Sequence, residues 1–96
     1  MARFAVELVF GDNPEERLAV RPAHREYLAT LVERGVLLVS GPWTDQTGAL
    51  LVYEVSDEAE LREILAADPY TPAGVVAETR VHEWEALMGT WLRPDA

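Results

Sequence analysis

The stretch that decides the fold is Val36–Val55, VLLVSGPWTDQTGALLVYEV. Two apolar runs, Val36–Val39 and Ala49–Val55, flank a link rich in Gly, Pro, Thr and Asp. Short apolar runs bounded by turn-forming residues predict strands, and a link this short favours an antiparallel hairpin. Because successive residues of both runs are apolar, the two strands are expected to carry apolar side chains on both faces of a sheet.

The sequence before this hairpin predicts a strand and a helix. Arg3–Phe10 alternates, with its apolar even-numbered residues on one face, and turn-forming residues follow it. Pro22 has the fixed φ that suits the first turn of a helix, so a helix is predicted over Pro22–Arg34 and is closed by Gly35. Glu15–Val20 is expected to be a polar connection with room for one turn of helix.

A second helix is predicted after the hairpin. Ser56 or Asp57 is expected to cap its first turn. The helix is expected to stop at Asp68, because the residue before a proline, here Pro69, is disfavoured in helical geometry. Tyr70–Gly74 is expected to be a loop.

Val75–Trp84 alternates and predicts the last strand, and residues 85–96 remain as a tail with apolar side chains. The predicted order is β-α-β-β-α-β. In a chain of 96 residues this is the ferredoxin-like α+β fold, a four-stranded antiparallel sheet with both helices on one face. Without repeats, low-complexity segments or linkers, residues 1–96 are expected to form a single domain with its core over about 3–84.

The predicted sheet has one face that its own helices cannot cover. Because the hairpin strands are apolar on both faces, a monomer would leave apolar surface in water. We expect a homodimer that buries the two open faces against each other, with the apolar tail reaching across to the partner. The alternative is a tail that folds back and covers its own sheet.

Composition excludes several function classes. Eight basic against 17 acidic residues give a net charge of −9, which disfavours nucleic acid and anionic membrane surfaces as partners. Thiolate and Schiff-base chemistry are excluded because the chain has no cysteine and no lysine. With no apolar run near the roughly 18 residues that span a bilayer, and no cleavable signal before the first strand, a soluble cytoplasmic protein is expected.

His24 is the leading candidate for chemistry near neutral pH. It lies one turn before Leu28 on the apolar stripe of the first predicted helix, so its ring is expected to point inward. Close to a helix N-terminus, the dipole would favour a neutral ring that can accept a proton. The alternative is a core histidine that is satisfied by a carbonyl group.

Other residues are candidate partners of His24. Asp68 is the carboxylate expected to orient the ring, unless it only terminates its helix before a proline. Arg21 is expected to hold an anionic substrate group, and Ser40 and Gly41 to offer a hydroxyl and an approachable N–H. Asp45 is a weaker candidate, since its loop is also ordinary turn chemistry.

No metal motif is present, because the two histidines, His24 and His82, are not spaced as ligands. His82 is expected to be a half-exposed strand residue. No cofactor is expected.

Taken together, these motifs resemble the YciI-related (YCII) domain over roughly residues 3–84. The residues that carry the resemblance are Arg21–His24 with Tyr27 and Leu28, Gly35–Leu38 leading to Gly41 and Pro42, Gly48 before a strand, and Ala67–Tyr70 with Ala73 and Gly74.

The resemblance implies a dimeric α+β barrel with an active site centred on a histidine and an aspartate, which correspond to His24 and Asp68. Similar barrels occur in muconolactone isomerases, antibiotic-biosynthesis monooxygenases and dye-decolorising haem proteins. A few relatives act on chlorinated or hydroxylated aromatic rings. The tail after Trp84 is not part of the family pattern.

Three hypotheses follow. The first is a small cofactor-independent enzyme, in which a His24–Asp68 acid–base pair acts on a small cyclic or aromatic substrate in a lyase, isomerase or dehydrochlorinase type of step. Arg21, Ser40, Gly41 and Tyr70 would bind the substrate. The second is a non-catalytic dimeric module that binds a small molecule. The third and weaker hypothesis is a haem- or metal-dependent barrel.

Overall fold

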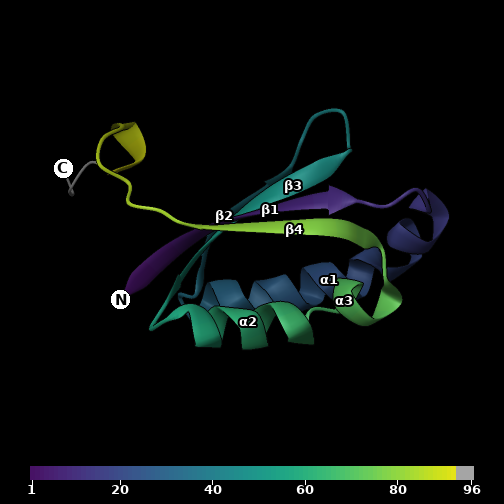
Figure 1. Ribbon diagram of the computed structural model, residues 1–96, viewed down its shortest axis with the longest axis horizontal. Helices are drawn as coiled ribbons and strands as arrows, with labels where there is room; N and C mark the ends of the chain where they lie inside the picture. The colour runs from purple at the N-terminus through teal and green to yellow at the C-terminus, as the bar shows by residue number, and fades with distance from the viewer. Residues whose placement is uncertain (93–96) are drawn as a thin grey trace.

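The computed structural model describes residues 1–92 and has an α+β architecture. Its four strands form one antiparallel sheet in the order β2-β3-β1-β4, and the helices lie together on one face of it (Figure 1). The predicted ferredoxin-like fold is therefore confirmed. The elements are β1 (Ala2–Phe10), α1 (Pro14–Glu33), β2 (Leu37–Pro42), β3 (Gly48–Val55), α2 (Glu58–Ala67), α3 (Tyr70–Ala73), β4 (Val76–Glu83) and a 3-10 turn (Thr90–Leu92).

The hydrophobic core lies between the sheet and the helices. The alternation of β1 turns Phe4, Val6 and Leu8 toward the helices, and the antiparallel register sets them opposite inward-facing residues of β3. Leu31 of α1 and Leu61 of α2 are fully buried against this layer. Each such side chain contributes about 1.5–3 kcal/mol by leaving water. Among residues 1–92, no helix is long and apolar enough to cross a membrane.

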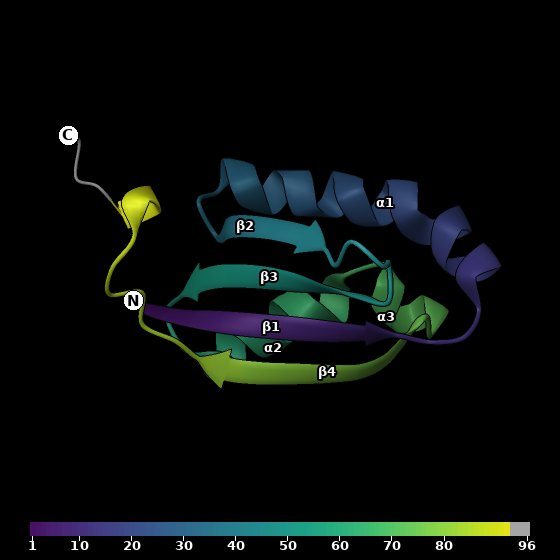
Figure 2. The same cartoon turned by 90° about the horizontal axis from the view of Figure 1, so that it is seen from above.

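The first helix begins earlier than its sequence indicates. It starts at Pro14, which occupies the first turn, and the side chain of Asn13 caps it by accepting a hydrogen bond from the Glu16 N–H at 3.2 Å. The prediction that Pro22 opens the helix was wrong. Pro22 lies inside α1, and in Figure 2 the first turns of α1 are tilted away from the rest.

This correction changes the environment expected for His24. The ring lies in the middle of α1, not at its N-terminus, so the expected influence of the helix N-terminal dipole is wrong. Gly35 does follow the helix end as predicted, with a φ of 73° in the left-handed region that favours glycine.

The second helix is capped and terminated by acidic residues. The Asp57 carboxylate accepts a hydrogen bond from the Glu60 N–H at 2.9 Å, and the Glu60 carboxylate reaches back to the Ser56 N–H at 2.7 Å. Asp68 follows the last helical residue in extended geometry, which is what the following proline requires. The predicted loop after it is instead the short helix α3, which ends at Gly74.

Strand ends differ slightly from those predicted. β2 extends to Pro42, well past Val39, because these residues continue to pair with β3 after an irregularity between Leu37 and Val39. At the other edge, β4 runs over Val76–Glu83.

The face of the sheet opposite the helices is open, as the sequence predicted. At its centre Val52 pairs with Ala5 of β1 and Val39 of β2, and the side chains of Val39 and Leu50 are 43% and 37% exposed. Ion pairs such as Arg3–Glu54, at 2.9 Å, flank this apolar centre. An open apolar centre with a charged rim is typical of an interface.

The described part of the tail does not cover this face. Leu87, Met88 and Trp91 are 79%, 91% and 88% exposed, and the tail leads away from the sheet in Figures 1 and 2. The alternative in which the tail folds back over its own sheet is therefore wrong for residues 85–92. Residues 93–96 lie outside the described part of the chain.

The ionisation of Tyr53 should make the fold sensitive to alkaline pH. Burial, and then the negative charge of Asp68, raise the pKa of Tyr53 well above its ordinary value of 10.0. The unfolded chain therefore loses this proton first and binds fewer protons than the folded chain. The free energy of unfolding should accordingly fall as the pH rises above about 10.

Urea denaturation from about pH 8 to about pH 11 measures this dependence. Tyr53→Phe should make it shallower without removing it, because burial also raises the pKa of Tyr27 and Tyr70. An unchanged slope in this variant would contradict the assignment.

Candidate active site

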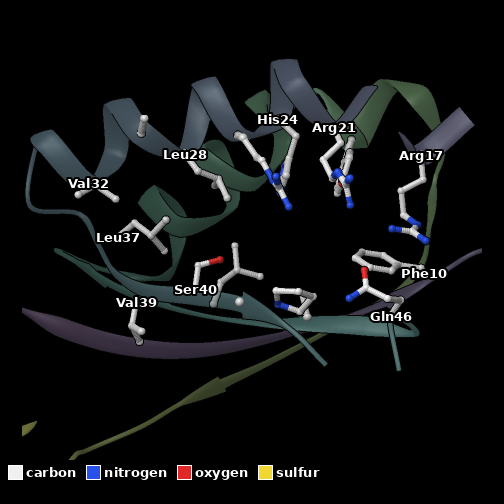
Figure 3. Close-up of a pocket in the computed structure, with 17 residues that line it drawn as sticks. Phe10, Arg17, Arg21, His24, Leu28, Val32, Leu37, Val39, Ser40 and Gln46 are labelled. Atoms are coloured by element: carbon white, nitrogen blue, oxygen red, sulfur yellow. The ribbon is translucent and has the colours of Figure 1, made fainter. Parts of the chain in front are cut away.

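A cavity of about 410 Å³ lies between α1 and the strands β2 and β3. Figure 3 shows side chains of α1 pointing into it from one side and residues of the sheet facing them from the other. Its volume is in the range of small-molecule sites. The lining residues are Phe10, Arg17, Arg21, His24, Arg25, Leu28, Ala29, Val32, Leu37, Val39, Ser40, Gly41, Pro42, Gln46, Ala49, Leu51 and Tyr70.

His24 is held in this cavity wall by Asp68. The His24 Nδ1 and Asp68 Oδ1 atoms are 2.8 Å apart, and both side chains are buried. A carboxylate accepts hydrogen bonds, so Nδ1 must carry the proton that joins them. In the neutral ring, Nε2 is then the free acceptor.

Asp68 is itself fixed by the start of α3. Its Oδ1 atom also accepts a hydrogen bond from the Tyr70 N–H at 2.9 Å. The extended residue at the end of α2 thus directs one carboxylate to two donors, one from α1 and one from α3. No further polar atom is needed to hold the imidazole in one orientation.

The ring of Tyr70 lies flat against the imidazole. The two ring centroids are 3.7 Å apart and the planes differ by 4°, while Phe10 meets Tyr70 edge-on at 6.0 Å. Burial raises the pKa of the Tyr70 hydroxyl, although Arg17 and Arg21 oppose this shift. Tyr70 is therefore a neutral hydroxyl that can donate a hydrogen bond at physiological pH.

The structure brings most of the sequence-predicted residues together. Arg21, Ser40, Gly41 and Tyr70 line the cavity beside His24, and Asp68 stands behind the ring. Asp45 does not line it: its carboxylate accepts hydrogen bonds from the Thr47 N–H and hydroxyl, as a turn residue does.

His82 lies elsewhere, exposed on β4. Among residues 1–92, no group of three His, Cys, Asp or Glu side chains is placed to hold a metal ion.

Among the polar and aromatic residues of the cavity, sequence reasoning missed four: Phe10, Arg17, Arg25 and Gln46. Gln46 could not have been found, because a turn with a positive φ of 64° brings it over the cavity. The two arginines did leave a signal. They lie four residues on either side of Arg21, a spacing that sets all three on one helix face, but only if the helix starts before Pro22.

Comparison with known proteins gives the family. The model of the YCII-related domain matches residues 3–85, and the chain belongs to this family. Protein YciI of Escherichia coli O6:H1 is 34% identical over 87 residues, covering 80% of this chain and 89% of its own. The derivative of benzaldehyde biosynthesis cluster protein C of Emericella nidulans is 31% identical, covering 70% and 80%.

Two solved structures share the fold. The 5-chloro-2-hydroxyhydroquinone dehydrochlorinase of Burkholderia phenoliruptrix AC1100, solved with 2,5-dihydroxybenzoquinone, is 27% identical with a TM-score of 0.78, and the match covers 86% of this chain and 93% of that one. An antibiotic biosynthesis monooxygenase is 18% identical with a TM-score of 0.57, covering 92% and 100%, and shares the fold.

Removing the Asp68 carboxylate should destabilise the fold. Asp68→Ala leaves the His24 Nδ1–H and the Tyr70 N–H without their buried acceptor, at a cost of about 2–3 kcal/mol. Asp68→Asn keeps an oxygen at that position and should cost about 1 kcal/mol. Urea denaturation of both variants tests this order. Equal decreases in the free energy of unfolding would show that the two hydrogen bonds to Asp68 do not stabilise the fold.

Proposed function

We propose that this protein is a cofactor-independent enzyme that moves a proton on a small cyclic or aromatic substrate, in a lyase or isomerase type of reaction. One observation carries the proposal. A buried histidine lines a ligand-sized cavity, and its Nδ1 is bonded to a buried carboxylate, Asp68, so that Nε2 is left for the substrate. This is the arrangement of an oriented general base.

His24 would take a proton from a carbon or oxygen of the ring through Nε2. The electron pair of the broken bond forms a new double bond within the substrate. In an elimination, a leaving group such as chloride then departs with its own bonding pair, and the substrate has lost one molecule of acid. In an isomerisation, the imidazolium returns the proton to another atom. Asp68 would stabilise the imidazolium in either case.

The cavity residues would position the ring. Arg21 is suited to an anionic oxygen, Ser40 offers a hydroxyl, and Gly41 lets the substrate approach the backbone. Tyr70, neutral and flat against His24, would fix the plane of the imidazole.

The comparisons support this class of reaction. A relative with 27% identity is a dehydrochlorinase of a hydroxylated aromatic ring and was solved with a quinone. The cavity walls here combine apolar strand residues with hydrogen-bonding groups, as a six-membered ring with oxygen substituents requires.

We further propose that the chain works as a homodimer through the open face of its sheet. Val39 and Leu50 leave apolar surface exposed on that face beside the buried Val52, and Trp84 and Trp91 after β4 add exposed apolar side chains that a partner could cover. A second copy would remove this surface from water.

The enzymatic proposal is tested by incubating the full chain with a panel of chlorinated hydroquinones and lactones. Chloride release and incorporation of solvent deuterium into the ring are followed. His24→Asn should lower the rate about 100-fold or more, because the proton acceptor is lost. Asp68→Asn should lower it about tenfold or more through misorientation of the ring.

Arg34→Gln is the matched control, since Arg34 lies at the end of α1 outside the cavity and its loss should leave the rate unchanged. If wild type binds these rings but neither releases chloride nor exchanges hydrogen, the chain is a non-catalytic binding module.

The dimer is tested by placing a charge at the centre of the open face. Leu50→Asp should shift the sedimenting species from dimer to monomer, because a buried carboxylate there would lack a partner. Leu18→Asp, at a leucine on α1 that is 47% exposed against 37% for Leu50, is the control and should remain dimeric. A wild-type chain that sediments as a monomer would overturn the proposal.

A further inference from the structure

Three arginines of α1 line the same wall of the cavity. Arg17, Arg21 and Arg25 are four residues apart, so they project from successive turns of one helix face. Figure 3 shows Arg17 and Arg21 pointing into the cavity on the same side as His24. Successive members of the row are roughly 6 Å apart along the helix axis.

This row has no ion-pair partner in the described part of the chain, although the Asp68 carboxylate lies behind His24. None of the three arginines forms an ion pair there, whereas Arg3, Arg62 and Arg80 all do. No Asp or Glu is among the lining residues of the cavity, although the chain has 17 acidic residues. Like charges four residues apart destabilise a helix, so the row is unfavourable while the cavity is empty.

The first arginine of the row is also held in place. Arg17 is only 9% exposed, and its guanidinium carbon lies 4.5 Å from the centroid of the Phe10 ring. A buried cation that is fixed over an aromatic ring and lacks a carboxylate is prepared for an anion that arrives with the ligand. Phe10, Ala49 and Leu51 offer that ligand an apolar floor.

We propose that the ligand of this cavity is a small dianion, a compact molecule with an apolar body and two ionised oxygen groups. The arginine row binds the two groups, one between Arg17 and Arg21 and one between Arg21 and Arg25. The body lies on the apolar floor below His24. This inference rests on the proposed function in taking the cavity as the substrate site.

Two charges fit the row better than one. A single anionic group reaches only two neighbouring arginines, whereas a second group also engages the third. Arg17 is the buried member of the row, and Arg25 at its other end is exposed. Two anionic groups on a small ring or a short chain can be one helical turn apart. Each of the three arginines then has an anionic group beside it. The chain as a whole is acidic, so its overall charge repels anions at long range. Any preference for an anionic ligand must therefore come from direct contact with the three arginines.

Isothermal titration calorimetry on the full chain tests the inference with matched probes. Succinate and phthalate supply two carboxylates, butyrate and benzoate supply one, and squarate supplies two ionised ring oxygens without a carboxylate. At least one dianion should bind about tenfold or more tightly than the monoanions. Comparison of squarate with phthalate tells which kind of oxygen group the site prefers.

Arginine variants test whether the preference for dianions comes from the arginine row. Arg17→Gln and Arg21→Gln should each abolish most of the preference for two charges, whereas Arg34→Gln removes the same charge outside the cavity and should retain it. The inference is overturned if monoanions bind as tightly as dianions, if no dianion saturates at millimolar concentration, or if Arg34→Gln has the same effect as Arg17→Gln.

These measurements read binding alone, so they separate the two proposals. His24→Asn should still prefer dianions, because the row does not need a proton acceptor. A chain that prefers dianions but transfers no proton would leave the inference standing and overturn the enzymatic proposal. A chain that transfers protons on uncharged rings and ignores dianions would do the opposite.

Discussion

A four-stranded sheet has two faces, and the helices of this chain cover only one of them. The covered face holds the core, where Val6, Leu31 and Leu61 are fully buried. The other face keeps Val39 and Leu50 43% and 37% exposed beside the buried Val52. The cavity lies on the helix side of this sheet, between α1 and the strands β2 and β3.

The chemistry of the cavity depends on where one helix ends. Asp68 is extended because a proline follows it, and this geometry turns its carboxylate toward α1. There it meets the imidazole of His24 and, at the same oxygen, the N–H of Tyr70. A short turn with an ordinary sequence thus fixes the orientation of a histidine that lies 44 residues away along the chain.

Charge is distributed unevenly between the outside of the molecule and the cavity. The chain carries a net charge of −9, yet its cavity is lined by three arginines and by no carboxylate. Elsewhere arginines are neutralised at the surface, as Arg80 is by Glu7 and Glu78. Such surface pairs add little to stability. The three cavity arginines have no such pairs among residues 1–92, so their charges remain available to an anionic ligand.

The sequence by itself determined the order of strands and helices, the inward alternation of β1, the caps at Asp57 and Gly35 and the apolar open face, because these follow from local periodicity and turn chemistry. It also indicated His24 and Asp68 as partners, but it misplaced the start of α1, since proline is favoured in a first turn and disfavoured in a helix interior, where Pro22 in fact lies. Only the tertiary structure decided that Arg17, Arg25, Phe10 and Gln46 share the cavity with His24. Their meeting depends on the length of α1 and on how it packs across the sheet, and such long-range packing leaves no local pattern in the sequence.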